Sequence, residues 1–248
     1  MIDIRDLRAE FNGKVILNNI SLKIEEKEIF VILGPSGCGK SVLLRNIIGL
    51  NNPTGGKIVA DEEEVNFNNK KSIENFRKKC GFLFQHSALF DSMTIEENLA
   101  FPILQHTNLS KKEIEERINE KLKLVGLNGV NKKKPSELSG GMQKRAALAR
   151  SIILEPKYIF YDEPTTGLDP IMSRVIDDLI KDLNNRLGVT SIVVTHDMKT
   201  ALRIADKICL LYGGEIIVNG KLDEVLELRN PYLTQFIEGE KNGPINLT

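Results

Sequence analysis

Short apolar runs separated by polar and glycine-rich segments dominate the pattern along this chain. Four of these runs occupy residues 28–33, 82–85, 158–161 and 191–196. The second and the fourth end in glutamine and histidine, and the first and the third are followed directly by glycine and a carboxylate. Unbroken apolar runs of this length are typical of strands that are buried on both faces of a parallel sheet. Parallel sheets of α/β proteins bind ligands beyond the carboxyl ends of their strands. The pattern therefore predicts an α/β protein with a ligand site at that edge.

The pattern changes in two other parts of the chain. Residues 2–56 contain short strand-like runs with turn signals at 12–13 and 52–56. From Asp91 to Pro135 strand signals disappear, and Ser110 with Glu113 forms a capping box. An apolar stripe at helical spacing follows this box, at Ile114, Ile118, Leu122 and Val125. We therefore expect a helical insertion over about residues 91–140.

The segment GPSGCGKS at residues 34–41 matches the phosphate-loop pattern G-x-x-x-x-G-K-[ST] without mismatch. Its three glycines permit backbone angles that let successive N–H groups face an anion. A helix predicted to begin near Lys40 adds its positive N-terminal end. Lys40 supplies a cation for the β- and γ-phosphates, and the Ser41 hydroxyl is a Mg²⁺ ligand. We expect ATP and Mg²⁺ as cofactors; the alternative is a glycine turn between strand and helix.

Polar residues at the other strand ends add hydrolytic chemistry. Asp162 is placed to reach Mg²⁺, directly or through water, and Glu163 to polarise an attacking water as a general base. His196 is placed to contact the γ-phosphate, and Gln85 to approach the metal ion and the water. Alone, each has an ordinary explanation, such as a solvated acidic turn or a surface histidine. Together with the phosphate loop they favour a hydrolytic nucleotide site.

The segment LSGGM at residues 138–142 is not needed for nucleotide binding by an ordinary nucleotide-binding domain. Its Ser-Gly-Gly sequence is a second candidate anion-binding nest, followed by a helix predicted over 142–154. One chain thus carries two phosphate-facing helix starts but only one lysine-bearing loop. A head-to-tail homodimer, with ATP between the loop of one subunit and the nest of the other, explains both. The alternative is a glycine-opened helix start of packing origin.

With these motifs in this order from Ile2 to Glu227, the chain resembles the ABC ATPases, the nucleotide-binding subunits of ABC transporters. The resemblance implies an ABC-type P-loop NTPase fold with a mainly parallel core sheet, an N-terminal antiparallel β-subdomain and a helical signature subdomain. It implies one ATPase domain over 1–229, with the helical subdomain inserted, and a C-terminal tail over 230–248. It also implies integral membrane permease subunits as partners, received by the helical subdomain and the Gln85 loop at the cytoplasmic face of the inner membrane.

The resemblance also assigns roles to individual residues. The catalytic residues it implies are Lys40, Gln85, Glu163 and His196. The metal ligands are Ser41, Gln85 and Asp162. The nucleotide-binding residues are Phe11, which stacks on adenine, the loop residues Gly34, Pro35, Ser36, Gly37, Cys38, Gly39, Lys40, Ser41 and Val42, and Ser139, Gly140, Gly141, Gln143 and Asp169.

Composition narrows the function classes. Lysine plus arginine and aspartate plus glutamate each number 34, and this zero net charge argues against a nucleic-acid surface. The longest apolar runs are strand-sized and no secretory signal pattern opens the chain, so transport requires separate membrane subunits. Three cysteines without metal spacing suit a reducing cytosol. Cys38 is interpreted as a small loop residue, with a redox role as the alternative.

The tail and two internal segments indicate a subfamily. NPYLTQFIEGEKNGPI (230–245), DSMTIEENLAFPIL (91–104) and YDEPTTGLDPI (161–171) resemble the Mla-type lipid-transport ATPases. The resemblance implies phospholipid cargo, lipid-binding partner subunits and a tail that helps to hold the ATPase dimer. A frayed terminus is the alternative for the tail. For the function, the alternatives are another cargo (amino acid, ion or drug), a soluble ABC ATPase acting on DNA or ribosomes, and a P-loop kinase, which LSGGM disfavours.

Overall fold

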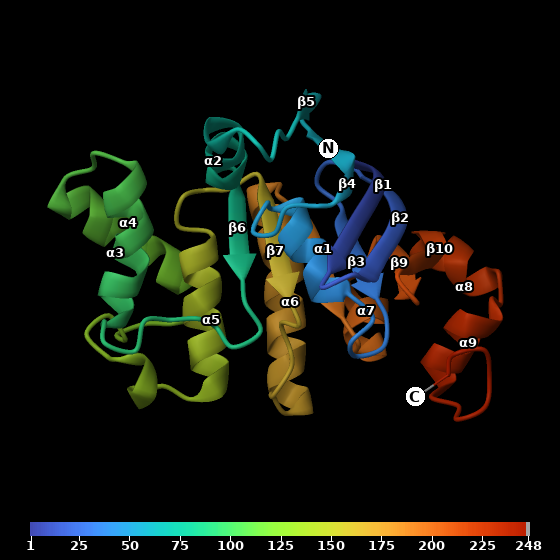
Figure 1. The fold of residues 1–248 in the computed structure, drawn as a ribbon. Helices are drawn as coiled ribbons and strands as arrows, with labels where there is room; N and C mark the ends of the chain where they lie inside the picture. The colour runs from blue at the N-terminus through green and yellow to red at the C-terminus, as the bar shows by residue number, and fades with distance from the viewer. Residues whose placement is uncertain (247–248) are drawn as a thin grey trace.

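Two sheets with different strand directions form the fold of residues 1–246, which a computed structural model describes (Figure 1). The first sheet is antiparallel, in the order β2-β1-β4-β5. Its strands are β1 (Ile2–Phe11), β2 (Lys14–Ile24), β4 (Gly55–Ala60) and β5 (Glu63–Glu64). Asn12 and Gly13 join β1 to β2 with φ of 50° and 77°, the left-handed angles that a tight hairpin requires.

The second sheet has the order β10-β9-β3-β8-β7-β6 and is parallel except for β10 at one edge. Its strands are β3 (Ile29–Leu33), β6 (Cys80–Leu83), β7 (Tyr158–Asp162), β8 (Thr190–Thr195), β9 (Lys207–Tyr212) and β10 (Glu215–Lys221). Every residue of β3, β7 and β8 is buried, which accounts for the unbroken apolar runs. The predicted α/β fold, with a mainly parallel core sheet and a separate antiparallel sheet, is confirmed.

Alternate residues of the core strands belong to two hydrophobic cores. Phe30 and Ile32 face the antiparallel sheet and α1 (Lys40–Ile47), whereas Val31 and Leu33 face the helices of the opposite side. Helix α1 contacts strands of both sheets. The segment that joins β3 to α1 is thereby fixed at the junction of the two sheets, and this segment is the predicted phosphate loop.

Helices make up the part of the molecule on the left of Figure 1. They are α3 (Ile95–His106), α4 (Lys111–Leu124), the short 3₁₀ helix η1 (Pro135–Glu137) and α5 (Gly140–Ser151). The capping box predicted at Ser110 and Glu113 is present at the start of α4, and Thr94 with Glu97 forms a second one before α3. Ile118, Leu122 and Val125 are buried, so the predicted stripe is a packing face. The helical prediction for this part of the chain is confirmed.

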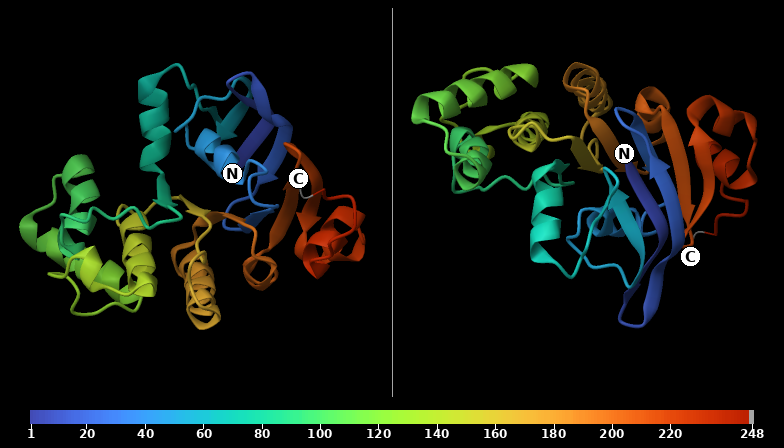
Figure 2. Two further views of the ribbon diagram at one scale, coloured as in Figure 1. Left: turned by 60° about the horizontal axis from the view of Figure 1, so that its bottom comes forward. Right: turned by 90° about the horizontal axis from the view of Figure 1, so that it is seen from above.

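The remaining helices lie around the core sheet and at the C-terminal side (Figure 2). They are α2 (Lys70–Lys78), α6 (Pro170–Leu187), α7 (Met198–Ile204), α8 (Leu222–Glu227) and α9 (Pro231–Glu238). Among residues 1–246, no helix combines the length and the apolar character that crossing a bilayer would take.

The C-terminal tail folds back on its own chain. Leu233 of α9 is buried, and the buried amide of Gln235 binds both the N–H and the carbonyl of Ile245. Tyr232 and Phe236 pack against the main core. These apolar residues therefore have partners within the chain, and a role of the tail in holding a dimer stays a prediction. The last two positions predicted as tail, Leu247 and Thr248, lie outside the described residues.

Candidate nucleotide-hydrolysis site

The glycines of the phosphate loop serve two different purposes. Gly37 and Gly39 have φ of 80° and 105°, and Gly39 in this left-handed conformation leads directly into α1. Gly34 does not have a positive φ. A Cβ atom there would lie 2.4 Å from the carbonyl oxygen of Leu211 on β9. The expectation that all three glycines supply unusual backbone angles is therefore wrong for Gly34, which is required by close packing against a neighbouring strand.

Lys40 lies over the loop to which it belongs. Its Nζ donates hydrogen bonds to the carbonyls of Gly34 (2.8 Å) and Pro35 (2.9 Å) and lies 3.5 Å from Oε1 of Glu163.

Burial raises the pKa of the nearby Cys38 thiol, although Lys40 acts in the opposite direction. A raised pKa disfavours the reactive thiolate, so the packing interpretation of Cys38 is the better one.

Ser41 and Asp162 bring two hard oxygen donors together. The Ser41 hydroxyl, at the start of α1, donates a 2.7 Å hydrogen bond to Oδ1 of Asp162 at the end of β7. Hydroxyl and carboxylate oxygens are the ligands that Mg²⁺ prefers, and this ion usually takes only one or two protein carboxylates beside water and phosphate. The donor set at Ser41 and Asp162 therefore fits Mg²⁺ held jointly with a nucleotide.

Glu163 has a strained backbone and a buried carboxylate. Its φ of 49° is unusual for a residue with a side chain, and such a conformation costs on the order of 1–3 kcal/mol. Its N–H donates to the Val194 carbonyl (3.0 Å), and its Oε2 lies 2.8 Å from Nδ1 of His196. The carboxylate is 10% exposed and lies between Lys40 and His196. The surrounding residues thus hold it at one place beside the phosphate loop.

One pocket of about 630 Å³ brings most of the predicted site together. Its lining comprises Phe11, Ile16, Ser36, Gly37, Gly39, Lys40, Ser41, Val42, Arg45, Asn51, Gln85, Glu163 and His196. Phe11 is 44% exposed, so one face of its ring is available to a ligand. Sequence reasoning missed Ile16, Arg45 and Asn51. Of these three, only Ile16 could have been suspected from the sequence, because it lies just beyond the hairpin turn that follows Phe11.

The signature residues lie elsewhere, since none of the described residues that line this pocket comes from 138–143. Ser139 and Gly140 are exposed, and a Cβ on Gly141 would lie 2.5 Å from Cε of Met172 in α6. The signature and the start of α6 are therefore neighbours.

Two residues predicted to contact the nucleotide have structural tasks. The Gln143 Nε2 donates to the carbonyls of Pro135 (2.9 Å) and Leu138 (3.2 Å). The Asp169 carboxylate caps α6 by accepting from the amides of Ile171 (2.9 Å) and Met172 (3.0 Å). The Gln143 nitrogen is thus not available to a phosphate, and direct contacts of these two residues with ATP stay predictions.

Lys144 is a further buried cation near the site that the sequence did not single out. Burial lowers the pKa of its ammonium to about 8, while the negative charges of Asp162 and Glu163 act in the opposite direction. Its Nζ donates to the backbone carbonyl of Gln85. The contact joins residues 59 positions apart, so no sequence spacing indicates it.

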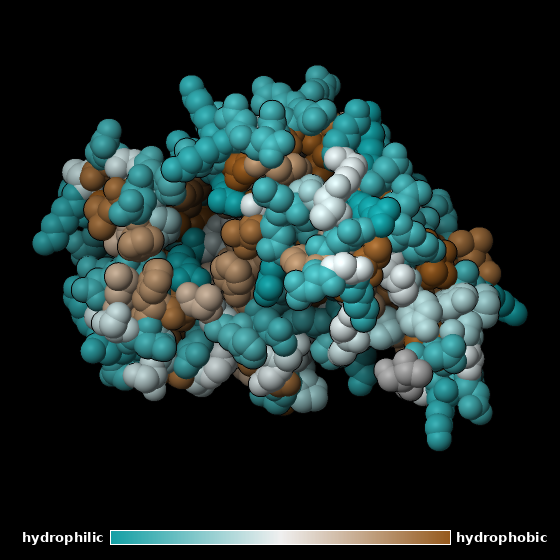
Figure 3. All heavy atoms as spheres, viewed as in Figure 1, coloured by the Kyte–Doolittle hydropathy of each residue, from teal (hydrophilic) through white to brown (hydrophobic). Residues whose placement is uncertain are grey.

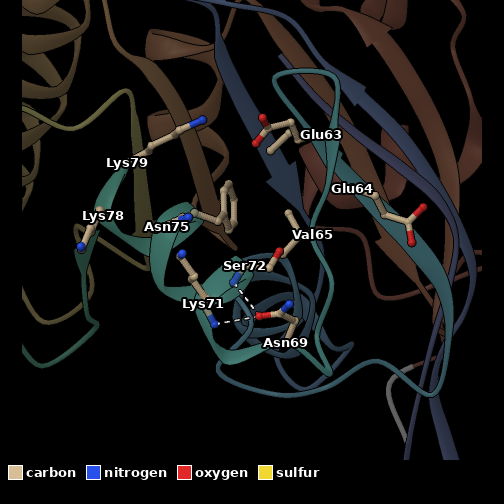
Figure 4. Close-up of a pocket in the computed structure, with 11 residues that line it drawn as sticks. Glu63, Glu64, Val65, Asn69, Lys71, Ser72, Asn75, Lys78 and Lys79 are labelled. Atoms are coloured by element: carbon tan, nitrogen blue, oxygen red, sulfur yellow. Dashed lines mark hydrogen bonds between the residues drawn. The ribbon is translucent and has the colours of Figure 1, made fainter.

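A separate pocket of about 550 Å³ lies between β5 and α2 (Figure 4). Lysines and glutamates line it, but the side chain of Asn69 already accepts hydrogen bonds from the amides of Lys71 and Ser72. The first amides of α2 are therefore occupied, and the pocket shares no lining residue with the candidate site.

Comparison with known proteins agrees with this geometry. The family described as ABC transporter matches residues 17–166, more than half of the chain. The chain belongs to the ABC transporter ATPase family. It is 41% identical to the intermembrane phospholipid transport system ATP-binding protein MlaF of Haemophilus influenzae, over 99% of this chain and 93% of that protein. It is 39% identical to the probable ribonucleotide transport ATP-binding protein mkl of Mycobacterium leprae, over 100% of this chain and 71% of that protein.

A solved structure supports the same conclusion. The dimeric post-hydrolysis structure of the ATP-binding cassette MJ0796, bound to ADP and Pi, superimposes with a TM-score of 0.82 at 34% identity. The match covers 90% of this chain and 99% of the other. The chain is therefore an ATP-binding ABC subunit with ATPase activity, and the predicted family, fold and enzyme class are confirmed.

Proposed function

We propose that this chain is the ATP-hydrolysing subunit of a transporter that moves phospholipid between membranes. We further propose that it works as a head-to-tail homodimer, bound to integral membrane permease subunits at the cytoplasmic face of the inner membrane. The observation that carries the catalytic part is the buried Glu163 carboxylate, fixed between Lys40 and His196 beside the phosphate loop.

In this proposal the pocket residues divide the work. Phe11 stacks on adenine, and the backbone N–H groups of residues 34–42, apart from Pro35, donate to phosphate oxygens. Lys40 moves from its own loop carbonyls to the β- and γ-phosphates. Ser41 and Asp162 would hold Mg²⁺, with Gln85 beside them, and the bound ion would neutralise charge that develops on the phosphates. Glu163 accepts the proton of the attacking water, and His196 orients this carboxylate and reaches the γ-phosphate.

The proposal of a dimer rests on the position of the signature, which contributes no residue to the lining of the nucleotide pocket. The proposed ligand for Ser139, Gly140 and Gly141 is therefore the ATP held by a second copy of the chain. Because Met172 packs on Gly141, the start of α6 reaches the same interface, and Asp169 contributes there by shaping it. A two-fold dimer would then contain two composite sites.

An aromatic groove provides the proposed permease contact. A pocket of about 860 Å³ between β6, α2 and α3 is lined by Phe82, Phe84, Phe90, Phe101 and Pro102, among others. Phe90 and Phe101 remain 44% and 41% exposed. Figure 3 shows a hollow with apolar atoms beside it between the helical part and the rest of the molecule. Exposed aromatic residues around a groove are typical of a protein contact site. The groove includes the segment after Gln85, so an inserted permease helix would act directly on the Gln85 loop.

The support for phospholipid cargo is the MlaF match, which runs through nearly all of both chains. The mkl match, at similar identity, makes ribonucleotide transport the alternative. Partners of the Mla type would include lipid-binding subunits.

To test the cargo, the chain is tagged and purified with its membrane partner, and the complex is reconstituted in proteoliposomes. Phospholipid-dependent stimulation of ATP hydrolysis is expected. Stimulation by ribonucleotides instead, with no response to lipid, would reject the proposal.

A further inference from the structure

Two cations of the signature helix bind the backbone of the Gln85 loop, defined here as residues 84–90. Lys144 Nζ donates to the Gln85 carbonyl. Arg150 donates to the Ser87 carbonyl through Nη2 (3.0 Å) and to the Ala88 carbonyl through Nη1 (2.7 Å). Three carbonyls of one short loop are thus bound by two side chains of α5.

The loop needs such support because its backbone is unusual. Ser87 and Ala88 have consecutive φ values of 62° and 49°, a left-handed conformation that residues with side chains rarely adopt. Ser87 N–H donates to Phe84 O (3.0 Å) and Ala88 N–H to His86 O (2.6 Å), which closes a tight turn. Strained conformations of this kind persist only where the surroundings hold them.

The position of Lys144 links three functional parts. Its side chain is 5% exposed, and α5 packs against β6, the strand that precedes the loop (Figure 1). The same helix begins with the exposed Gly140 of the signature nest. The nest, Lys144 and the Gln85 carbonyl therefore form one connected unit. A hydrogen bond from a buried charged donor resists displacement more strongly than a neutral one.

We propose that Lys144, assisted by Arg150, is a positioning residue that fixes Gln85 to the signature helix, so that docking of the signature on a partner's nucleotide also sets Gln85. This inference rests on the proposed role of Gln85 at the metal ion and the attacking water. Lys144 itself touches neither the nucleotide nor the water. Its removal should therefore impair the chemical step and spare the binding of ATP.

The test uses the full chain and four variants. Lys144→Met removes the charge and the donor at similar length, and Lys144→Arg retains both. Lys121→Met is the matched control, because Lys121 is equally buried in the helical part but binds Glu120 (2.9 Å) and Glu155 (3.0 Å) instead. Gln85→Ala reports on the proposed role of Gln85 independently. Turnover is measured against ATP and against Mg²⁺, and hydrogen exchange is followed over residues 84–90.

We expect Lys144→Met to lower kcat by about 10- to 100-fold, the effect of small misplacements in an active site, with the KM for ATP within about threefold. It should raise the Mg²⁺ concentration for half-maximal activity and accelerate exchange in the loop. Lys144→Arg should restore most of the activity, and Lys121→Met should retain it.

Three outcomes would count against these ideas in distinguishable ways. Normal turnover in Gln85→Ala would reject the proposed role of Gln85. Impaired Gln85→Ala with normal turnover and exchange in Lys144→Met would reject the coupling alone. Equal losses in Lys144→Met and Lys121→Met would show a general packing effect. Arg150→Lys replaces the two guanidinium nitrogens that reach the Ser87 and Ala88 carbonyls with a single ammonium nitrogen. If Lys144→Met does not fold, Arg150→Lys must still accelerate exchange at 87–90 for the proposal to stand.

Discussion

His196 Nδ1 lies 2.8 Å from Oε2 of Glu163, although the two residues are 33 positions apart. They meet because β7 and β8 are parallel neighbours, and each residue directly follows its strand. The contact holds the carboxylate at the pocket, where Lys40 approaches its other oxygen. His196 and Lys40 thus orient the carboxylate that we propose as the general base.

Glu163→Gln should retain ATP binding and lower hydrolysis by about 10²- to 10⁴-fold, the usual range for loss of a general base. Glutamine keeps the volume and the contacts to His196, so the pocket should stay formed. The variant should also accumulate as an ATP-bound dimer that elutes earlier with ATP than with ADP. Turnover assays, nucleotide binding and size-exclusion chromatography test this. Rapid turnover would exclude Glu163 as the base, and Glu64→Gln, on the exposed strand β5, serves as the control.

Mixed dimers should reveal composite sites. If ATP lies between the phosphate loop of one chain and the signature of the other, Lys40→Ala on one chain and Ser139→Ala on its partner damage the same site. The second site then remains intact and should retain about half of the wild-type activity, if the sites act independently. Placing both substitutions on one chain damages both sites and should abolish hydrolysis. Differently tagged chains, purified as mixed dimers, allow the comparison. The reverse ranking of activities would contradict the head-to-tail arrangement.

Sequence reasoning located the part of the site that depends on strand order. Gln85, Asp162, Glu163 and His196 follow apolar runs, and adjacent parallel strands bring their ends to one edge. It could not find contacts made by long side chains to distant backbone, as between Lys144 and Gln85, because a carbonyl carries no residue-specific signal. Gly34 illustrates the same limit, since its neighbour is a β9 carbonyl nearly 180 residues away.

Asp61→Asn should destabilise the fold without affecting the nucleotide pocket. Asp61 lies in the turn between β4 and β5 and binds Lys79 (3.0 Å) and Lys157 (2.5 Å) next to the core sheet. Burial raises the pKa of Asp61, but hydrogen bonds from Lys157, Tyr158 and Lys79 outweigh it and hold the pKa below the usual 3.8. The expected loss at pH 7 is about 1.5–3 kcal/mol in the free energy of unfolding, the range for hydrogen bonds to charged groups.

The pH dependence of this loss has a definite sign. Because the folded-state pKa is lowered, the ionised Asp61 stabilises the fold fully above the unfolded-state value, and this contribution disappears as the pH falls below it. The difference between wild type and Asp61→Asn should therefore be constant from pH 7 to about 5 and shrink at lower pH. Urea unfolding at several pH values measures it. Asp182→Asn, which breaks an exposed pair with Arg186, should change stability by less than about 0.5–1 kcal/mol.

Two residues of the tail helix α9 allow a role in dimer contact to be distinguished from a role in the folding of the single chain. Leu233 is 2% exposed, whereas Ile237, one turn further along α9, is 37% exposed and contributes to the tail's outer surface. Leu233→Ala should therefore destabilise the chain itself, by about 2–5 kcal/mol for a large-to-small change in a core. Ile237→Asp should leave the stability of the chain almost unchanged, because the side chain is already in contact with water.

If the tail holds the dimer, Ile237→Asp should weaken it. Burial of one isoleucine contributes about 1.5–3 kcal/mol, and each 1.4 kcal/mol changes a dissociation constant tenfold. A two-fold dimer buries two copies, so the dimer constant should rise by at least about tenfold, and turnover at low protein concentration should fall with it. Sedimentation and ATPase assays over a dilution series test this, with Leu104→Asp, an exposed leucine of α3, as the control. An unchanged dimer in Ile237→Asp would mean that α9 only covers its own chain, and the Mla-type assignment would then lose the support of the tail.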